Sequence, residues 1–435
     1  MRHCREHLRR FTRSASWVAA GLVGLTACAP RAPAPVGPQP GREPLVRVGI
    51  VVDTTQIQLS APGTLEVRDA ETGQPVHIAE PAQSAIVRVD ERGELWVRVG
   101  ETEMRGGTAV VAAAEIAGLV RIGEREYRGS ALIRATGPGR LTVINQVGME
   151  DYLLGVVPQE IGRVGIELFE TAKAQAVAAR TYAVRYLGRR AALGFDVFAT
   201  TADQVYGGYS SEHEPVSRAV VATAGEMLTY NAEPIDAFYH STCSGQTAAI
   251  EEVWPREPRR PYLISVVDVN PATGVPFDSV SSRFRWTQRW TADELRRILS
   301  ETLADSLPQG VPPLLAEGVT DVGELREFHI VDRTVSGRIR TMRIVTDAGE
   351  FQIGADPIRW AFRTPQGAVL NSSKFDIATV RGDDGRIQEV VAYGAGWGHG
   401  IGMCQVGAMG RARAGQDYRT ILNAYYPGTT ITDLY

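Results

Sequence analysis

Glu160 occupies a position in the sequence that suits acid–base chemistry. It follows the apolar residues 153–157 and Pro158, and it precedes an alanine-rich stretch. A carboxylate at such an apolar junction loses hydration, and desolvation raises its pKa toward that of a useful general acid. An exposed loop glutamate without a chemical role is the alternative interpretation.

A second cluster of reactive side chains lies at residues 237–245, where His240, Ser241 and Cys243 are closely spaced. They indicate a nucleophile, a pair of metal ligands or a polar binding strip. The His240-x-x-Cys243 spacing is compatible with zinc, but a zinc site needs three or four ligands. A cysteine nucleophile would need a reactive thiolate and a partner base. These alternatives stay open at the level of sequence.

A third cluster, residues 394–408, combines many glycines with Trp397, His399 and Gln405. Glycines permit positive φ and let a ligand approach the backbone closely. Trp397 offers a flat apolar face of the kind that stacks on sugars. The spacing matches neither a Walker loop nor a dinucleotide-binding fingerprint. A tight structural loop is the alternative.

One long helix, expected over residues 167–187, must position these clusters. Four alanines recur on one of its faces: Ala172, Ala176, Ala179 and Ala183. Small side chains let another backbone approach closely, so we expect this helix to be central. Two polar pairs lie on neighbouring faces: Lys173 with Arg180, and Gln175 with Tyr182. A solvated polar face is the alternative interpretation of these pairs.

The remaining pattern predicts an α+β protein with a β-rich N-terminal lobe at 45–145 and a mixed α/β body at 146–435. Short alternating or β-branched runs separated by Asp- and Gly-containing turns indicate the lobe, and one such run is 127–134. Within the body, a β-rich segment is expected at about 270–390. It includes a helix opened by the capping box Thr291-x-x-Glu294 and a hairpin of 327–331 with 338–345. A short helix is expected at 418–425.

The N-terminus resembles an export signal. Basic residues, a short apolar run and small residues precede Cys28, which predicts a signal peptide at 1–28. Residues 25–28 resemble the bacterial lipobox, whose cysteine is lipidated and anchors the protein to a membrane. Plain secretion with a chance cysteine is the alternative. A proline-rich linker follows at 29–44, so we expect an exported, lipid-anchored protein of the bacterial cell envelope.

Composition limits the remaining function classes. The chain has 435 residues, with 46 basic and 50 acidic side chains and a formal net charge of −4. A nucleic-acid-binding protein would usually carry a clear basic excess, so this partner is not expected. Four cysteines in a chain of this length do not make a disulfide-stapled miniprotein.

The three clusters together resemble the SpoIID/LytB family (stage II sporulation protein D and amidase enhancers). The resemblance rests on residues 150–160, 173–182, 239–242, 252–254, 261–263, 396–408 and 425–429, which occur in the family's order. It covers roughly 130–435.

The resemblance implies work on peptidoglycan. It implies a lytic transglycosylase that cuts the MurNAc–GlcNAc β-1,4 bond of peptide-free glycan strands and leaves 1,6-anhydroMurNAc. It places the catalytic glutamate at Glu160 and matches the following positions to a substrate groove: Lys173, Gln175, Arg180, His240, Ser241, His399 and Gln405. Trp397 joins them as the sugar-stacking candidate. No cofactor is expected. Some relatives ligate zinc near the His-Ser-Thr motif, which makes His240 and Cys243 weak metal candidates.

Two departures from the family pattern stand out. Residues 161–165 replace a stretch that often contains Met-Pro and Trp, and Cys404 stands where many members have serine. In an exported protein Cys243 and Cys404 could form a disulfide that joins two clusters.

Three rival functions follow from the same residues. The first is a non-catalytic, glycan-binding enhancer of a cell-wall amidase. The second is a hydrolase in which Asp151, Glu251 or Asp268 supplies a second carboxylate. The third is a zinc metalloenzyme that loses activity with a chelator.

Overall fold

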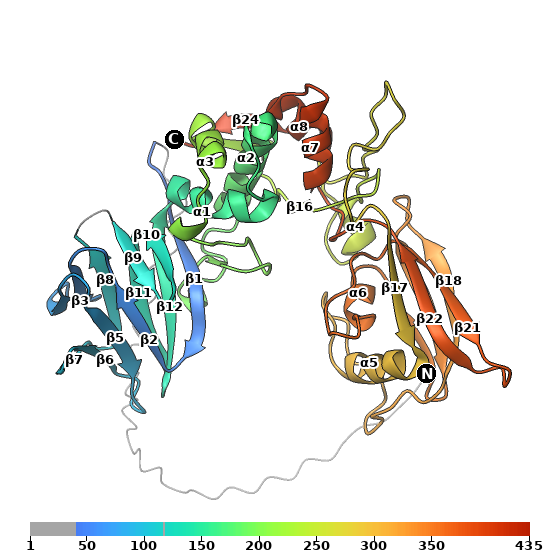
Figure 1. The fold of residues 1–435 in the computed structure, drawn as a ribbon, viewed down its shortest axis with the longest axis horizontal. Coiled ribbons are helices and arrows are strands. Elements are labelled where there is room, and N and C mark those ends of the chain that lie inside the picture. Colours follow the sequence, from blue (N-terminus) through green and yellow to red (C-terminus); the bar gives the residue numbers. More distant parts are fainter. Residues whose placement is uncertain (1–40, 116–117) are drawn as a thin grey trace, which may run out of the picture. The chain divides into compact units, whose positions relative to one another are not determined.

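The computed structural model describes residues 41–115 and 118–435 and contains both helices and sheets (Figure 1). The predicted α+β class is confirmed. The predicted signal peptide (1–28), its lipidation site Cys28 and most of the predicted linker (29–44) lie outside the described residues. Within the described ranges, no helix is both long and apolar enough to cross a membrane.

The region predicted as a β-rich lobe consists of two antiparallel sheets with one short parallel addition. One sheet has the strand order β13-β1-β12-β11-β8-β3-β4 and the other β10-β9-β2-β5-β6-β7. Alternate residues point into a shared core: β5, for example, buries Ala85, Val87 and Val89. The strands are β1 (Leu45–Thr54), β2 (Gln56–Ser60), β3 (Leu65–Asp69), β4 (Pro75–Ala79), β5 (Ser84–Val89), β6 (Leu95–Val99), β7 (Thr102–Arg105), β8 (Ala109–Ala114), β9 (Leu119–Ile122), β10 (Arg125–Arg128), β11 (Ser130–Gly137), β12 (Arg140–Gly148) and β13 (Val197–Phe198).

The predicted single run at 127–134 is divided between two strands. Strand β10 ends at Arg128 and β11 begins at Ser130, and the two belong to different sheets. Gly129 between them has a φ of 80°, and a Cβ at this position would collide with the carbonyl oxygen of Gln146. Glycine therefore permits the chain to pass from one sheet to the other here.

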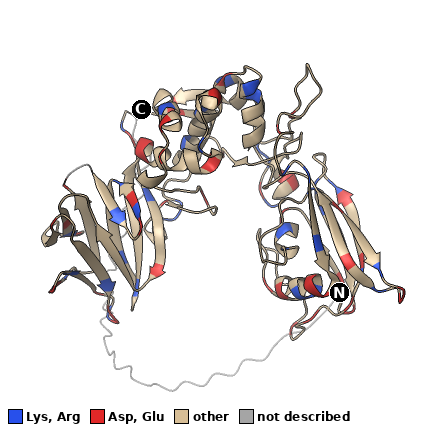
Figure 2. Cartoon of the chain, viewed as in Figure 1, with Lys and Arg blue, Asp and Glu red and all other residues tan. Residues whose placement is uncertain are grey.

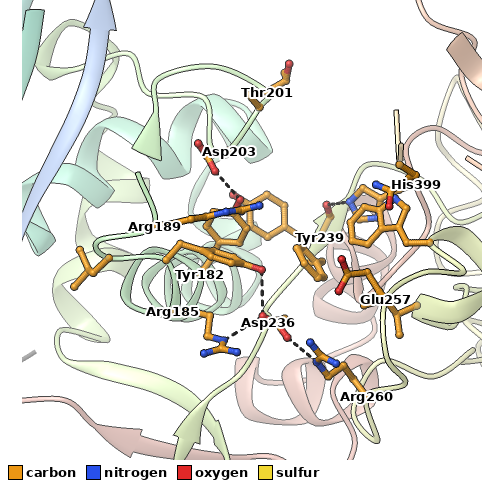
Figure 3. Close-up of a pocket in the computed structure, with 17 residues that line it drawn as sticks. Tyr182, Arg185, Arg189, Thr201, Asp203, Asp236, Tyr239, Glu257, Arg260 and His399 are labelled. Carbon is orange, nitrogen blue, oxygen red and sulfur yellow. Dashed lines mark hydrogen bonds and ion pairs between the residues drawn. The ribbon is translucent and has the colours of Figure 1, made fainter. Parts of the chain in front are cut away.

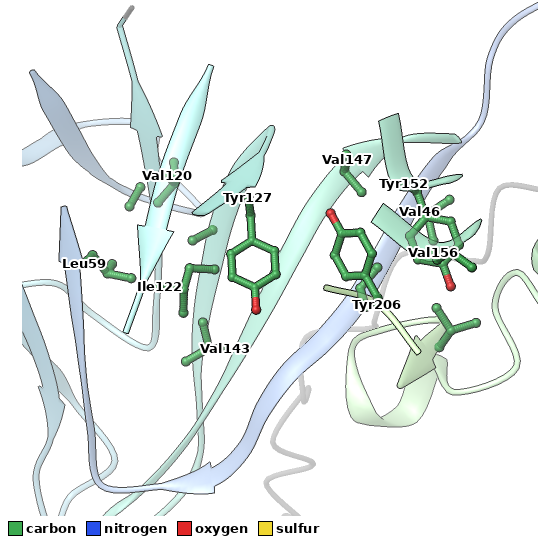
Figure 4. Packing of buried hydrophobic residues seen from close by; sticks show 14 of the residues in the cluster. Val46, Leu59, Val120, Ile122, Tyr127, Val143, Val147, Tyr152, Val156 and Tyr206 are labelled. Carbon is green, nitrogen blue, oxygen red and sulfur yellow. The ribbon is translucent and has the colours of Figure 1, made fainter. Parts of the chain in front are cut away.

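Helices α1 (Met149–Ile161), α2 (Phe169–Arg185) and α3 (Glu214–Ala222) continue the core of the lobe. In Figure 4 the ring of Tyr206 lies between the rings of Tyr127 and of Tyr152 in α1. Its centroid is 5.0 Å from that of Tyr152 and 5.7 Å from that of Tyr127 in β10. The lobe and the first helices of the body thus share one apolar core.

Helix α2 packs on two sides, which explains its alanine content. The predicted helix at 167–187 is observed as a 3-10 turn (Ile166–Leu168) followed by α2. Ala172, Ala176, Ala179 and Ala183 contribute to the core shared with the lobe. Ala174, Val177 and Ala178 contribute to a second core, formed with the C-terminal helices. The predicted central position of this helix is confirmed.

The second core collects short elements from distant parts of the sequence. The predicted helix at 418–425 is confirmed as α8, whose Asp417 cap accepts the Thr420 N–H at 2.8 Å. The elements of this region are β14 (Glu226–Tyr230), β15 (Glu233–Pro234), β16 (Tyr239–His240), α4 (Ile250–Val253), β23 (Met403–Cys404), α7 (Gln405–Arg413), α8 (Tyr418–Tyr425) and β24 (Thr430–Asp433). Two further 3-10 turns lie at Ala191–Leu193 and Tyr209–Ser211.

A third core belongs to the segment predicted as β-rich at about 270–390. Its sheets have the orders β17-β22-β21 and β18-β19-β20. The predicted capping box is present, because Thr291 Oγ1 accepts the Glu294 N–H and the Glu294 carboxylate accepts the Thr291 N–H. The predicted hairpin is also present, with Phe328 opposite Ile344. The elements are β17 (Trp286–Thr291), α5 (Ala292–Ala304), β18 (Leu325–Arg333), β19 (Ile339–Thr346), β20 (Gly349–Ile353), α6 (Ile358–Ala361), β21 (Phe375–Arg381) and β22 (Ile387–Gly394).

Acidic and basic side chains are interspersed along the strands and helices (Figure 2). Several ion pairs join segments that are far apart in sequence. Arg47 of β1 contacts Asp196 at 2.7 Å, and Arg128 of β10 contacts Glu212 at 2.5 Å. These pairs tie loops of the body to the strands of the lobe.

Candidate functional site

Backbone pairing brings the second and third sequence clusters together. Strand β16 pairs in parallel with β23, with Tyr239 opposite Met403 and His240 opposite Cys404. A further antiparallel bridge joins Thr242 to Trp397, with N–O distances of 3.0 and 2.8 Å. Neither two-residue strand was expected from sequence, because strands this short leave no periodic pattern.

Glu160 lies in the last turn of α1 and not in a loop, so the interpretation as an exposed loop glutamate is wrong. Its side chain is partly buried, and Oε1 accepts the backbone N–H of Val205 at 2.8 Å. Burial raises the pKa of Glu160 to about 7, although hydrogen bonds from Val205, Gln405 and Tyr239 act in the opposite direction. The carboxyl group therefore holds a proton over part of the population at neutral pH.

Gln204 organises the groups behind this carboxyl and was not expected from sequence. Its Nε2 donates to the Ala179 carbonyl at 3.3 Å and to the Tyr239 hydroxyl at 3.0 Å. Its Oε1 accepts from the Tyr152 hydroxyl at 3.1 Å. The next residue is Val205, the backbone donor to Glu160. The two consecutive glycines that follow Tyr206 were the available signal for a constrained loop.

Gln175 and Gln405 lie next to each other and face the same region. Gln405 begins α7, and its Nε2 donates to Gln175 Oε1 at 3.4 Å. Gln175 is fully buried, and its Nε2 has no hydrogen-bond partner among the described residues. Gln405 therefore links α2 to Glu160, as one of the groups that stabilise the charged form of that carboxyl.

His240 and His399 are both neutral at physiological pH. His399 Nδ1 accepts the Ile401 N–H at 3.0 Å, so Nε2 carries the proton and donates to the Tyr239 carbonyl at 2.9 Å. Burial lowers the pKa of His399 to about 3 and that of His240 well below its usual value. His240 Nδ1 lies 3.2 Å from the Ile401 carbonyl, and its buried Nε2, an acceptor, has no hydrogen-bond partner in the part of the chain that the structure describes.

Cys243 and Cys404 are both buried and are free thiols, so the proposed disulfide is not formed in this structure. Cys243 Sγ donates to Asp268 Oδ2 at 3.4 Å, and Cys404 Sγ accepts the Gly407 N–H at 3.3 Å. Burial raises the pKa of both thiols, which argues against a thiolate nucleophile.

The two thiols complete a donor set with His240. Its ring nitrogen and the two sulfur atoms lie within 4.8 Å of one another. Sequence suggested His240 and Cys243 alone; Cys404 is the third donor, contributed by the strand pairing. Nitrogen and sulfur donors in this number fit a zinc ion.

Trp397 is exposed, whereas Ser241 is partly buried. The Trp397 side chain is 45% exposed, and the Arg283 guanidinium lies 5.3 Å from its ring centroid. Ser241 Oγ is 3.2 Å from Thr242 Oγ1. Gly396 and Gly398 have φ of 81° and 104°, so the loop that presents the indole requires glycine.

Two residues matched to the substrate groove, Arg180 and Lys173, form ion pairs within the protein. Arg180 is completely buried, forms a bidentate ion pair with Glu150 at 2.7 and 2.6 Å, and donates to the Glu226 carbonyl. In this conformation it cannot touch a substrate, and the prediction of a groove position is wrong for Arg180. Lys173 pairs with Glu170 at 2.6 Å and lies 4.6 Å from the Tyr418 ring centroid.

The carboxylates considered as a second catalytic group have other partners. Asp151 lies 3.7 Å from Arg128, Glu251 pairs with Arg259, and Asp268 pairs with Arg411 at 2.9 Å. Within the described ranges, none of the three is among the groups that shift the pKa of Glu160. The three carboxylates considered from sequence therefore do not act on Glu160 in this structure.

A cavity of about 660 Å³ opens beside Tyr239 and His399 (Figure 3). Aromatic rings form much of its wall: Tyr182, Tyr186, Phe238 and Trp254. Carboxylates fix two of the phenols, because Asp203 accepts from the Tyr182 hydroxyl at 3.0 Å and Asp236 from the Tyr186 hydroxyl at 3.1 Å. Flat apolar faces with polar groups between them suit a saccharide.

Known proteins with similar sequences include members of one family. The family model described as "Stage II sporulation protein" matches residues 138–230, which include Glu160 and all of α2. An uncharacterized protein of Brachyspira hyodysenteriae is 31% identical over 311 residues, covering 71% of this chain and 73% of that protein. This chain belongs to the SpoIID/LytB family.

Two named family members are also similar. The amidase enhancer of Bacillus subtilis is 33% identical over 311 residues, which cover 64% of this chain and only 40% of that protein. Stage II sporulation protein D of the same organism is 28% identical over 305 residues, covering 67% of this chain and 76% of that protein. A second model, "Domain of unknown function (DUF8618)", matches residues 273–402 of this chain.

Proposed function

We propose that this protein is a peptidoglycan lytic transglycosylase in which Glu160 acts first as a general acid and then as a general base. The observation that carries the proposal is the partly buried carboxyl group of Glu160, whose pKa burial raises to about 7. Such a group is protonated often enough at neutral pH to donate, and is basic enough afterwards to accept.

The chemistry needs no second carboxylate. Glu160 protonates the glycosidic oxygen between MurNAc and GlcNAc as that bond breaks. The resulting carboxylate then removes the proton of the MurNAc 6-hydroxyl while its oxygen bonds to C1, which closes the 1,6-anhydro ring. No water is consumed, and Glu160 regains its proton. A glycoside hydrolase, by contrast, usually places two carboxyl groups on either side of the bond.

The surrounding residues have defined tasks in this proposal. Val205 N–H, Tyr239 and Gln405 stabilise the carboxylate formed after the first step. Trp397 and the aromatic wall of the 660 Å³ cavity contact sugar rings. The neutral His399 fixes the backbone of Tyr239 and does not compete as an acid.

If zinc is bound, His240, Cys243 and Cys404 would hold it. The ion would supply a structural crosslink between the segments around β16 and β23, and acid–base chemistry would stay with Glu160. Metal analysis of the purified chain, with and without substitution of Cys404 by serine, measures this directly.

A non-catalytic role as the enhancer of a cell-wall amidase is the second candidate, because one relative with 33% identity is named an amidase enhancer. In both cases the partner is the glycan strand of peptidoglycan. We also propose that the protein is exported and lipid-anchored through Cys28 to the cell envelope, on the sequence pattern of residues 1–28.

One experiment separates the two candidates. Peptide-free glycan strands are incubated with the protein alone, and intact peptidoglycan is incubated with an amidase with and without the protein. Anhydro-ended fragments in the first reaction support the transglycosylase. Strand binding without cleavage, together with faster amidase action in the second reaction, supports the enhancer.

A further inference from the structure

A second cavity, of about 700 Å³, lies in the segment that matches the domain of unknown function. All the residues that line it fall between Arg285 and Ala395, whereas the "Stage II sporulation protein" model ends at residue 230. Its walls come from β17, β21 and β22, from the end of β18 and from the turn before β19. The volume is in the range of small-molecule and saccharide sites.

The cavity carries an excess of positive charge. Arg285, Lys374 and Arg333 line it, against the single carboxylate of Asp376. Arg333 pairs with Asp376 at 2.5 Å. Among the described residues, Arg285 and Lys374 have no carboxylate within ion-pair distance.

Both unpaired cations are held in place by neutral groups. Lys374 Nζ donates to the Ser244 carbonyl at 3.3 Å, and the Arg285 guanidinium donates to Ser244 Oγ and to the Phe284 carbonyl. Burial lowers the pKa of Lys374, and the positive charge of Arg338 lowers it further. An anionic ligand would offset this repulsion.

Aromatic faces lie beside the cations. Trp286 donates through Nε1 to the Gly396 carbonyl at 2.9 Å, which fixes the orientation of its ring. Tyr393 also lines the cavity and is 50% exposed. Fixed aromatic faces with charged groups beside them recognise a flat apolar sugar face and an acidic substituent together.

The cavity adjoins the candidate active site. Ser244, which contacts both cations, directly follows the His240–Cys243 segment, and Gly394 and Ala395 of the cavity wall lead directly into the loop of Trp397. The cavity therefore borders the segments that carry His240, Cys243 and Trp397.

We propose that this cavity is a subsite for a sugar that carries a carboxylate, with Arg285 and Lys374 binding the carboxylate and Trp286 and Tyr393 contacting the ring. The identity of the sugar rests on the function proposed above. In a glycan strand without peptides, each MurNAc has a free lactyl carboxylate, whereas in a peptide-bearing strand that group is an uncharged amide. The subsite would thus distinguish peptide-free strands by charge.

Binding measurements by calorimetry test the subsite without cleavage. The Glu160→Gln chain is titrated with a peptide-free glycan tetrasaccharide, with the same tetrasaccharide after reduction of its carboxylates to alcohols, and with a glycerol-phosphate oligomer. Each titration is repeated with Arg285→Gln/Lys374→Met added. Arg289→Gln is the matched control, since Arg289 lies in β17, shortly after Arg285 and Trp286 in the chain, is not among the residues that line the cavity, and is paired with Glu389 at 2.9 Å. Thermal unfolding checks that each variant is folded.

We expect the double substitution to weaken binding of the acidic tetrasaccharide by about tenfold or more, because hydrogen bonds between charged groups are lost. Carboxylate reduction should weaken binding to the parent chain by a similar factor and leave the double variant little changed. Arg289→Gln should bind like the parent. Equal affinity of parent and double variant for the acidic sugar overturns the proposal. The proposal is also overturned if the double substitution weakens binding of the glycerol-phosphate oligomer and not binding of the acidic tetrasaccharide.

The two proposals fail separately. Wild-type protein that binds through the two cations but leaves peptide-free strands uncut contradicts the transglycosylase and keeps the subsite. Wild-type protein that cleaves these strands, with affinities unaffected by the double substitution, contradicts the subsite and keeps the transglycosylase.

Discussion

Removal of one hydroxyl group should shift the pH dependence of catalysis. The Tyr239 hydroxyl is among the groups that lower the pKa of Glu160. Tyr239→Phe deletes this group and retains the ring and the backbone carbonyl that accepts from His399. The charged form of Glu160 then loses a stabilising contact, so its pKa must rise.

The size of the shift follows from the energy of the contact. A hydrogen bond to a charged group contributes about 1.5 kcal/mol or more, which corresponds to about one pKa unit. The pKa of Glu160 in the wild-type protein is about 7. In the variant the alkaline limb of the pH–rate profile should therefore lie at about pH 8. At that pH, the protonated fraction of Glu160 should be roughly one half in the variant and roughly one tenth in the wild type.

The assay is kcat/KM for cleavage of peptide-free glycan strands, measured from about pH 5 to about pH 9, because this quantity reports the free enzyme. Tyr426→Phe is the matched control, since Tyr426 is a buried phenol that donates to the Phe238 carbonyl at 2.6 Å. It should leave the limb unmoved. If the limb of Tyr239→Phe is unchanged or moves to lower pH, the Tyr239 hydroxyl does not stabilise the Glu160 carboxylate.

Three further predictions concern stability. Glu160→Gln should raise the free energy of unfolding by up to about 3 kcal/mol at about pH 8 and by little at about pH 4, because the fold disfavours the charged form of Glu160. The wild-type protein does not carry this destabilisation below the ordinary pKa of glutamate and carries it in full above the raised pKa of Glu160. Urea unfolding at both pH values checks this, and a loss of stability at the higher pH would contradict it. Arg180→Met should cost about 3 kcal/mol, because Glu150 loses its ion-pair partner, and adding Glu150→Met should recover part of the loss; no recovery in the double variant opposes this. Gly129→Ala should lower the melting temperature, through its positive φ and a collision with the Gln146 carbonyl, and an unchanged melting temperature would count against that strain.

Local signals in the sequence predicted those elements whose stability is local. The capping box at Thr291 and Glu294 depends on residues three apart, and it marks the start of α5 in the structure. The alanine spacing along α2 likewise predicted a central helix, since a face of small side chains lets another backbone approach closely.

What the sequence did not predict depends on contacts between distant segments. The backbone N–H of Val205 has no side-chain signature, so its bond to Glu160 emerges only in the fold. The sequence pattern placed Arg180 on a polar helix face, whereas in the structure it is buried and forms an ion pair with Glu150, thirty positions away. Cys404 became a neighbour of His240 through a two-residue strand pair that no periodicity marks.

The central claim is that Glu160 alone performs acid–base catalysis on the glycan strand. The most direct test is mass spectrometry of peptide-free strands after incubation with the wild-type protein and with Glu160→Gln, which keeps the side-chain shape and the acceptor for Val205. We expect 1,6-anhydroMurNAc ends from the wild type and none above background from the variant. Hydrated reducing ends from the wild type, or anhydro ends formed at the same rate by Glu160→Gln, would contradict it.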